Sequence, residues 1–527
     1  MTVPTPVTPV DAEPASVTDR LACPCVPVDD ALLARLRDCC TDVSTADGVL
    51  AEAGRDWWPI AIRWATRGAV PQRPGAVARP TTTQQVASVL ACCNDARVPV
   101  SAAGGRSGVC GSSVPVFGGV ALDMTGVEGV VDIDTTSCVA DVRAGTFGPE
   151  LERSLRAEGM TLGHWPQSMD LSTVGGWVAC RGAGQYSTRY GKIEDMVIGL
   201  NVAMADGTLV TTGGTAPRAA VGPDLNQVFV GSEGTLGIVT DARLRLHPVA
   251  PAEGRRAWGF ADFAQGLDAC RRILRRGATP AVLRLYDQVE SARNFSEGSR
   301  AVLIVLDEAD PVILESTLQV ADVECRSAGA DPLEVELVES WVEKKNDVSA
   351  LAPLYRGGIV VDTIEVAARW AVLPDLYTSC IDSLKAVEGT LVASAHLSHS
   401  YTDGACIYLT FAGRMPDSAD RGGADGGGGG APGDTSGESN EAEQASDRWA
   451  ESYYNSAWTA VMDAVIGAGG AISHHHGIGI NRSRFVSPSI GGGARLLESL
   501  KNALDPRGIL NPGKLGLPSP FGEVGWP

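Results

Sequence analysis

Aromatic residues make up only 6% of this 527-residue chain, and the sequence has no long apolar run. A helix that crosses a membrane needs about 18 or more consecutive apolar residues, and no segment reaches that length. The first residues also lack the charged start and unbroken apolar stretch of a secretory signal. These absences exclude a membrane-spanning protein and predict a cytoplasmic one, with contact at a membrane surface left open.

Basic residues are also scarce, because 43 Lys and Arg stand against 63 Asp and Glu and give a formal net charge of -20. A chain this acidic is repelled by the phosphates of nucleic acid and of anionic lipid. We therefore expect no nucleic-acid partner. Any phosphate that the protein binds must be held by groups that converge locally.

Cysteines give no sign of a disulfide framework. They number thirteen, an odd count, and include the adjacent pairs Cys39-Cys40 and Cys92-Cys93, which is typical of reduced thiols in a cytoplasm. Cys23 and Cys25 have no second pair downstream at the spacing of zinc ligands. The sequence therefore predicts no metal site.

Histidine occurs only seven times, yet five of the seven lie in two short stretches, His396 with His399 and the run His474, His475 and His476. Imidazole changes its protonation state near neutral pH, so a cluster of histidines suits proton transfer or metal binding. A polyhistidine surface loop is the alternative. The flanking glycines and the short apolar segment before the run favour a built turn that holds the imidazoles in place.

The pattern along the chain predicts an α+β protein of at least two domains. Short Val, Ile and Leu strands alternate with a few helices and many glycine turns between about residues 70 and 250. Helical periodicity over 263–276 and 374–386 is mixed with strand candidates at 301–306, 358–365 and 405–411, which indicates an antiparallel sheet backed by helices. The expected units are a disordered N-terminus (1–28), a helical segment (29–69), a first domain (70–250), a second domain (251–478), a Gly-rich flexible insert within it (417–447), and a C-terminal segment (479–527).

Three glycine-rich stretches carry the chemistry of the first domain. The loop at 102–108 follows a helix expected over 86–96 and a strand expected over 98–102, and its small residues let backbone amides converge on an anion. The other two stretches are 166–187 and 231–240. A Rossmann site is excluded, because the second stretch is one residue short of the GxGxxG fingerprint and lacks the long helix and later acidic residue.

The order of these stretches resembles the flavin-binding domain of the vanillyl-alcohol oxidase and p-cresol methylhydroxylase superfamily. The segments 163–177 and 190–195 are similar to the alkyldihydroxyacetonephosphate synthases within it. The resemblance covers about residues 70–512. It implies a two-part FAD-binding domain (70–250), a cap domain (251–478), and a C-terminal segment (479–527) that returns to the FAD-binding domain. It implies that FAD is bound by Ala103, Gly104, Gly105, Arg106, Ser107, Gly108, Pro166, Ser168, Ser172, Thr173, Gly175, Gly176, Gly182, Gly184, Tyr186, Ser187, Glu233, Gly234, Gly237, Ile238 and Asn511.

The resemblance also bears on how FAD is attached. Members with covalent FAD commonly use a histidine at the first glycine loop or a cysteine just before the Thr-Val-Gly step. Here those places hold Arg106 and Leu171-Ser172, so we expect non-covalent FAD. Arg106 departs from the synthases, which have threonine at this position.

The synthase resemblance implies that the second domain supplies the reacting groups. His474, His475 and His476 match the histidine run, Tyr408 matches the catalytic tyrosine, and Arg284 and Arg356 match arginines near the substrate. Tyrosine and histidine exchange protons, whereas a guanidinium fixes a phosphate or carboxylate. Taken alone, Tyr408 could be a core residue and Arg284 a surface ion-pair residue.

The implied activity replaces the acyl group of acyl-dihydroxyacetone phosphate by a fatty alcohol through a covalent flavin adduct, without net oxidation. The alternative is an FAD-dependent dehydrogenase or oxidase of a 2-hydroxy acid or alcohol. Such relatives carry a metal motif where this chain has residues 396–401, and a glutamate where it has His475, which favours the synthase type. The expected partner is a small or lipid-like phosphate or carboxylate substrate, and the expected assembly is a homodimer.

Overall fold

The computed structural model describes residues 9–214, 216, 218–346, 351–416 and 435–525. The first part of the FAD-binding domain is a mixed four-stranded sheet in the order β2-β4-β6-β5, packed against α1 and α4. Thr82 caps α4 by accepting a hydrogen bond from the Gln85 amide. The elements of this part are α1 (Asp30–Cys39), β2 (Val43–Ser44), α2 (Asp47–Ala53), α3 (Pro59–Ala65), β4 (Ala76–Ala78), α4 (Thr83–Ala96), β5 (Val100–Ala103), β6 (Val120–Asp123) and η2 (Met124–Gly126).

The second part is a five-stranded antiparallel sheet in the order β11-β10-β12-β8-β7. Its inner face packs against α5 and α6 in one apolar cluster. The elements are β7 (Val130–Asp134), β8 (Val139–Arg143), α5 (Gly148–Ala157), β9 (Met160–Thr161), η3 (Met169–Leu171), α6 (Val174–Cys180), α7 (Ser187–Tyr190), α8 (Ile193–Met196), β10 (Val197–Ala203), β11 (Leu209–Thr212), α9 (Asn226–Phe229), β12 (Ile238–Arg245) and β13 (His247–Pro248).

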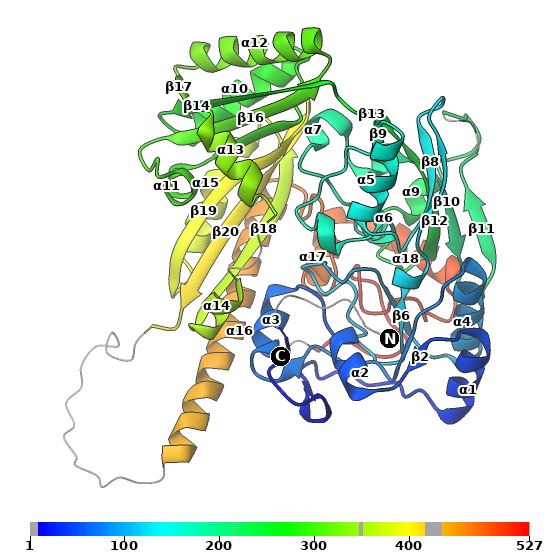
Figure 1. The fold of residues 1–527 in the computed structure, drawn as a ribbon. Coiled ribbons are helices and arrows are strands. Elements are labelled where there is room, and N and C mark those ends of the chain that lie inside the picture. Colours follow the sequence, from blue (N-terminus) through cyan, green and yellow to red (C-terminus); the bar gives the residue numbers. More distant parts are fainter. Residues whose placement is uncertain (1–8, 215, 217, 347–350, 417–434, 526–527) are drawn as a thin grey trace, which may run out of the picture.

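The cap is a seven-stranded antiparallel sheet in the order β17-β14-β16-β15-β19-β20-β18 (Figure 1). Helices α10, α12, α15 and α16 pack on one face, and α13 packs on the other. This confirms the expected sheet backed by helices. The elements are β14 (Ala252–Phe260), α10 (Phe263–Arg275), β15 (Val282–Tyr286), α11 (Gln288–Phe295), β16 (Ala301–Ala309), α12 (Pro311–Ser327), β17 (Asp331–Leu333), α13 (Glu336–Lys344), α14 (Leu351–Arg356), β18 (Ile359–Arg369), α15 (Leu373–Lys385), β19 (Thr390–Ser400), β20 (Gly404–Arg414) and α16 (Thr435–Gly467).

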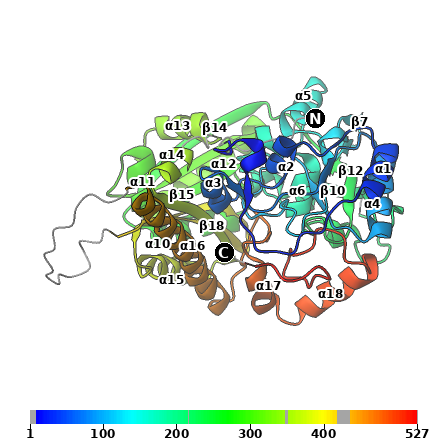
Figure 2. The same cartoon turned by 90° about the horizontal axis from the view of Figure 1, so that it is seen from below.

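The C-terminal segment returns to the FAD-binding domain, where α17 (Ser483–Ile490) and α18 (Gly493–Leu504) lie (Figure 2). Leu510 forms a parallel bridge with Val100, the first residue of β5. In the part of the chain that the structure describes, no helix combines the length and apolar character that crossing a bilayer requires. All thirteen cysteines are free.

Two expectations about disorder need correction. Residues 9–28 are folded: η1 (Pro14–Ser16) precedes β1 (Thr18–Asp19), which pairs with β3 (Ala69–Val70). Val17 and Leu21 are 3% and 4% exposed, because these apolar side chains dock on the domains and offset the entropy of ordering. Residues 1–8 lie outside the described residues.

The Gly-rich insert is shorter than expected at its C-terminal end. Helix α16 begins at Thr435, whereas the sequence indicated a start at Trp449. Residues 441–445 are Glu, Ala, Glu, Gln and Ala, which favour a helix, and Asp447 forms an ion pair with the buried Arg63. Residues 417–434 lie outside the described residues.

Candidate active site

One cavity of about 610 Å³ lies between the FAD-binding domain and the cap. Its walls come from the three glycine stretches on one side and from strands β15, β18, β19 and β20 on the other. Volumes of this order are typical of sites for cofactors and small ligands. The cavity therefore brings together segments that the sequence analysis selected independently.

The first glycine loop packs so closely on its neighbours that it tolerates no side chain at two positions. A Cβ on Gly104 would lie 2.1 Å from Thr173 Oγ1, and one on Gly105 would lie 1.8 Å from the Leu171 carbonyl oxygen. Both distances are far below contact. The loop and the 171–173 segment thus form one backbone-lined wall, which suits an anion such as a diphosphate.

Several polar atoms in this wall have no hydrogen-bond partner among the described residues. They are the Nε and Nη2 atoms of Arg106, the hydroxyls of Ser112 and Ser113, and both ring nitrogens of His164. Each unpaired buried group costs about 1–3 kcal/mol, so a polar ligand in the cavity would offset that cost. The residues present therefore fit FAD.

Most of the predicted cofactor-binding residues line the cavity. These are Ala103, Gly104, Gly105, Arg106, Ser107, Gly108, Pro166, Ser168, Ser172, Thr173, Gly175, Gly176, Gly182, Glu233, Gly234, Gly237 and Ile238, together with the predicted catalytic residues Arg284, Tyr408, His475 and His476. The lining does not include the predicted residues Gly184, Tyr186, Ser187, Asn511 and His474. Arg356 lies elsewhere and forms an exposed ion pair with Asp11.

Four residues from four strands form one row across the cap sheet. Tyr286 is opposite His396, His396 is opposite Tyr408, and Tyr408 is opposite Glu365. The alternate residues on these strands, such as Leu285, belong to the apolar core beneath the helices. Period-two alternation thus turns the row and Arg284 toward the cavity.

Arg284, His396 and Glu290 form a hydrogen-bonded chain at one end of this row. Arg284 Nη2 donates to His396 Nε2 at 2.5 Å, and His396 Nδ1 contacts Glu290 Oε2 at 2.7 Å. A guanidinium can only donate, so the proton of His396 is on Nδ1. Burial, with the Arg284 charge, lowers the pKa of His396 to about 4, and the imidazole is neutral at pH 7.

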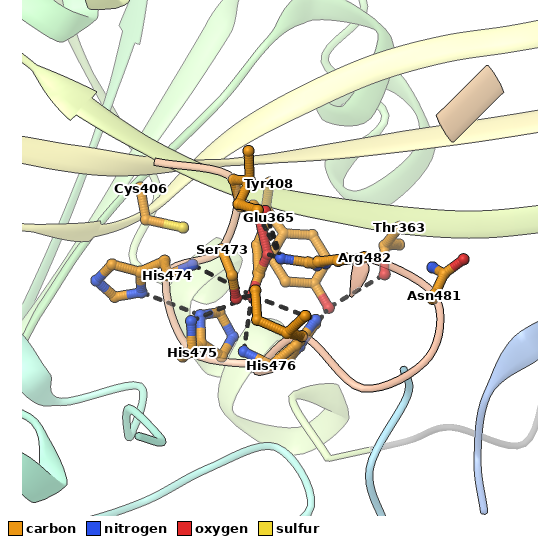
Figure 3. A network of polar contacts seen from close by, with 12 residues as sticks. Thr363, Glu365, Cys406, Tyr408, Ser473, His474, His475, His476, Asn481 and Arg482 are labelled. Atoms are coloured by element: carbon orange, nitrogen blue, oxygen red, sulfur yellow. Dashed lines mark hydrogen bonds and ion pairs between the residues drawn. The ribbon is translucent and has the colours of Figure 1, made fainter. Parts of the chain in front are cut away.

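Glu365 holds the histidine run in place (Figure 3). Its Oε1 accepts hydrogen bonds from the backbone amides of His474, His475 and His476 at 3.3, 3.1 and 2.7 Å. Its Oε2 lies 2.5 Å from the guanidinium of Arg482, and both side chains are fully buried. Burial would raise the pKa of Glu365, but Arg482 and these hydrogen bonds outweigh it and lower that pKa to about 2.

Glu233 holds the exit of the same turn from the FAD-binding domain. Its carboxylate accepts hydrogen bonds from the amides of Ile478 and Gly479. Asn511 Nδ2 donates to the Glu233 carbonyl oxygen at 2.6 Å. Glu233 and Asn511 thus connect the histidine turn to the glycine loops.

The Tyr408 hydroxyl lies 3.2 Å from Thr363 Oγ1 and 3.4 Å from His476 Nε2. Its ring is stacked on His396, with 5.0 Å between centroids. Burial raises the pKa of Tyr408 well above its ordinary value, and burial lowers the pKa of His476 to about 4. The site therefore presents a neutral phenol beside a neutral imidazole, which can pass a proton in either direction.

Three imidazoles could also hold a metal ion, because ligand atoms of His399, His474 and His475 lie within 4.8 Å of one another. Their present partners are Ser187 Oγ for His399 and a contact of 3.0 Å between the Nδ1 atoms of His474 and His475. In the described part of the chain no carboxylate contacts these three rings, whereas metal-bound histidines usually have such a partner. The absence of a metal stays a prediction.

Acid is expected to weaken both activity and stability through these buried histidines. His396 and His476 have pKa values of about 4 in the folded protein, against about 6.5 in an unfolded chain. Between pH 6.5 and 4 the unfolded state binds more protons, so the free energy of unfolding falls as the pH falls. Thermal unfolding midpoints measured from pH 8 to 4 should decline mainly below pH 6.5. An unfolding midpoint that rises as the pH falls from 6.5 to 4 would contradict the conclusion that His396 and His476 are buried and neutral.

The two predicted arginines should behave differently. Arg284→Ala should lower kcat about 100-fold or more, as the loss of one charge-stabilising donor does. Arg356→Ala removes only a surface ion pair, so activity should stay within about twofold. The measurement is kcat/KM of both variants under one assay. Equal losses would show that Arg356 acts on the substrate after all.

Three acidic residues of the site carry no motif of their own in the sequence. Glu290 and Asp56 line the cavity, whereas Glu365 is fully buried and supports the histidine run. Burial raises the pKa of Asp56 to about 7, and its Oδ2 faces the first glycine loop without a partner. Only the alternation of β18 could have pointed to Glu365, as a charged residue in a strand whose neighbours are apolar.

The fold and the site define a flavin-dependent enzyme with a two-part FAD-binding domain and a cap that completes the cavity. Residues 74–213 match the family model described as FAD binding domain, and residues 255–515 match FAD linked oxidases, C-terminal domain. The chain belongs to the FAD-linked oxidase family of the p-cresol methylhydroxylase and vanillyl-alcohol oxidase type.

Curated relatives show the range of this family. The chain is 30% identical to the FAD-linked oxidoreductase YgcU of Escherichia coli (strain K12), over 84% of this chain and 89% of that protein. It is 27% identical to the alkyldihydroxyacetonephosphate synthase of Dictyostelium discoideum, over 85% and 74%. It is 26% identical to the glycolate oxidase subunit GlcD of Bacillus subtilis (strain 168), over 84% and 89%.

A solved structure of alkyldihydroxyacetonephosphate synthase superposes with a TM-score of 0.72 at 22% identity, covering 97% of this chain and 89% of that one. At this level of identity the likeness shows the shared fold alone. It agrees with the two-part FAD-binding domain and cap expected from the sequence.

Proposed function

We propose that the protein is a flavoenzyme of the alkyldihydroxyacetonephosphate synthase type, which replaces the acyl group of acyl-dihydroxyacetone phosphate by a fatty alcohol. The bond between the substrate carbon and its acyl oxygen breaks, a bond from that carbon to the alcohol oxygen forms, and a fatty acid leaves. Atoms and electrons balance without an external oxidant. FAD, when bound, supplies an electron-accepting ring.

One observation carries this proposal: the cavity joins Tyr408 and His476, 3.4 Å apart, to an arginine whose hydrogen-bond partner is a neutral histidine. Tyr408 and His476 would move the proton that leaves and returns at the substrate carbon. Arg284 would hold the anionic group of the substrate. His475 lines the same cavity, where the rival hydroxy-acid enzymes of the superfamily are expected to carry a carboxylate.

The rival function is oxidation of a 2-hydroxy acid or alcohol, and one pair of assays separates the two. The holoenzyme is given acyl-dihydroxyacetone phosphate and a labelled fatty alcohol, and separately is mixed anaerobically with candidate 2-hydroxy acids. Label in the ether product, with the flavin spectrum unchanged after turnover, supports the synthase. Bleaching of the flavin at a catalytic rate by a hydroxy acid, without label transfer, overturns it.

FAD is expected to be released intact when the protein is denatured with acid. His164 and Cys180 line the part of the cavity that the FAD-binding domain forms, and their side chains are of the types that bond flavin covalently. Burial raises the pKa of the Cys180 thiol far above neutral pH, so the thiolate needed for attack is scarce. Flavin absorbance in the supernatant, with none in the pellet, is the predicted result. Flavin that stays with the wild-type pellet but not with a Cys180→Ala pellet would contradict it.

A further inference from the structure

The cap end of the cavity is unusually basic for this acidic protein. The cavity is lined by five basic residues, Arg106, Arg284, Arg293, Lys344 and Lys345, and by four acidic ones, whereas the whole chain has 43 basic and 63 acidic residues. All of these cations except Arg106 belong to the cap. Their charge is thus concentrated at one end of the cavity.

Two of these cations are held against the same indole. The Arg284 guanidinium carbon lies 5.8 Å and Lys345 Nζ 5.6 Å from the ring centroid of Trp341. Trp341 is buried in α13, and Lys345, the C-cap residue of this helix, follows it by four residues and so lies near it. The Tyr186 hydroxyl, 3.4 Å from Lys345 Nζ, positions the amine from the side of the FAD-binding domain.

Three of the cap cations, Arg284, Lys344 and Lys345, have no carboxylate partner among the described residues. Arg284 donates to a neutral histidine, and no carboxylate of the described chain lies within ion-pair distance of Arg284, Lys344 or Lys345. Arg293 differs, because it lies 3.1 Å from Glu290. Burial lowers the pKa of Lys345, and Glu308 and Glu253 attract its amine only from farther away. Arg284 and Lys345 lie on one indole and repel each other unless an anion binds between them. Lys344 precedes Lys345 as an exposed residue of the same cavity wall.

We propose that Arg284, Lys344 and Lys345 form a phosphate-binding subsite, which takes the head of a dianionic phosphomonoester substrate. A single guanidinium matches a carboxylate, so a monocarboxylate would leave the two lysines unneutralised. A phosphate dianion offers more acceptor oxygens and a second negative charge. This subsite adds a binding site for the phosphate group to the proposed function. The rest of the substrate is identified by the proposed function, on which the inference rests. It also supplies the second cation that the resemblance expected from Arg356.

The experiment measures binding to the FAD-loaded enzyme by isothermal titration calorimetry, with dihydroxyacetone phosphate and with glycolate as probes. The double variant Lys344→Gln and Lys345→Gln should raise the Kd of dihydroxyacetone phosphate about tenfold to a hundredfold. The Kd of glycolate should change less than about twofold. Lys345→Arg should retain most of the affinity, and Lys385→Gln, which removes an exposed charge at the end of α15, should have no effect. FAD content and the unfolding midpoint check that each variant is folded.

The outcomes separate this subsite from the proposed reaction. Lysine-dependent binding of dihydroxyacetone phosphate without fatty-alcohol exchange supports the subsite and overturns the reaction. Exchange with unaltered phosphate affinity in the double variant overturns the subsite and leaves the reaction. Equal weakening of both probes, or no binding of dihydroxyacetone phosphate to the wild-type enzyme, also overturns the subsite. In those cases the lysines act only as favourable charges near the C-terminal end of α13.

Discussion

Tyr408→Phe is expected to lower kcat by about 10²- to 10⁴-fold, the usual effect of removing a group that transfers a proton. The hydroxyl is the only part removed, and it lies between Thr363 and His476 at the cavity wall. The ring remains and still stacks on His396, so FAD content and the unfolding midpoint should be close to those of the wild type. The measurements are single-turnover rates and flavin absorbance per protein.

Tyr401→Phe is the matched control for Tyr408→Phe. Tyr401 also lies in the cap and loses a hydroxyl that contacts Ser187 Oγ at 3.0 Å, but it does not line the cavity. Its activity should fall much less. A Tyr408→Phe enzyme with wild-type kcat would remove Tyr408 from the reaction, and loss of FAD from that variant would make the residue structural.

Glu365→Gln is expected to lower both stability and activity. The substitution leaves the charge of Arg482 without its partner inside the protein, and breaking a buried ion pair in this way costs about 3–5 kcal/mol. The three amides of the histidine run also lose a charged acceptor, so the imidazoles should lose their fixed positions. A thermal unfolding midpoint and kcat, measured on the FAD-loaded protein, report the two effects separately.

A second variant distinguishes positioning from mere stability. Glu365→Gln combined with Arg482→Met removes both charges, and such replacements often recover stability. The double variant should therefore regain much of the unfolding midpoint without regaining kcat. Recovery of both would show that Glu365 contributes only to folding. Glu233→Gln, which removes the carboxylate on the other side of the turn, tests whether the exit of the histidine turn needs the same support.

Local elements were predictable from the sequence because their signals are local. The helix over 263–276 and the strands near 301, 358 and 405 follow from apolar periodicity, and the structure has α10, β16, β18 and β20 there. The errors fall where tertiary contacts override composition. Residues 9–28 are rich in proline and show no helical or strand periodicity, yet Val17 and Leu21 are buried by other parts of the chain.

The candidate site was predictable only as a set of residues. Each glycine stretch and the histidine run carry a recognisable pattern, and these predict an anion-binding wall and an imidazole cluster. The role of Arg356 could not be predicted, because its position depends on how α14 packs. Its ion-pair partner, Asp11, is 345 residues away in the sequence. The roles of Glu365 and Glu290 could not be predicted, because a lone glutamate belongs to no recognisable motif.

The sequence by itself determined which groups this protein can use: backbone amides of tight glycine turns, an imidazole run, a tyrosine and an arginine, in an acidic chain. Only the tertiary structure decided how those groups meet. The register of β15, β19, β20 and β18 places Tyr286, His396, Tyr408 and Glu365 in one row, and a shift of one residue would turn them into the core. Register depends on long-range pairing and packing, which no local pattern encodes.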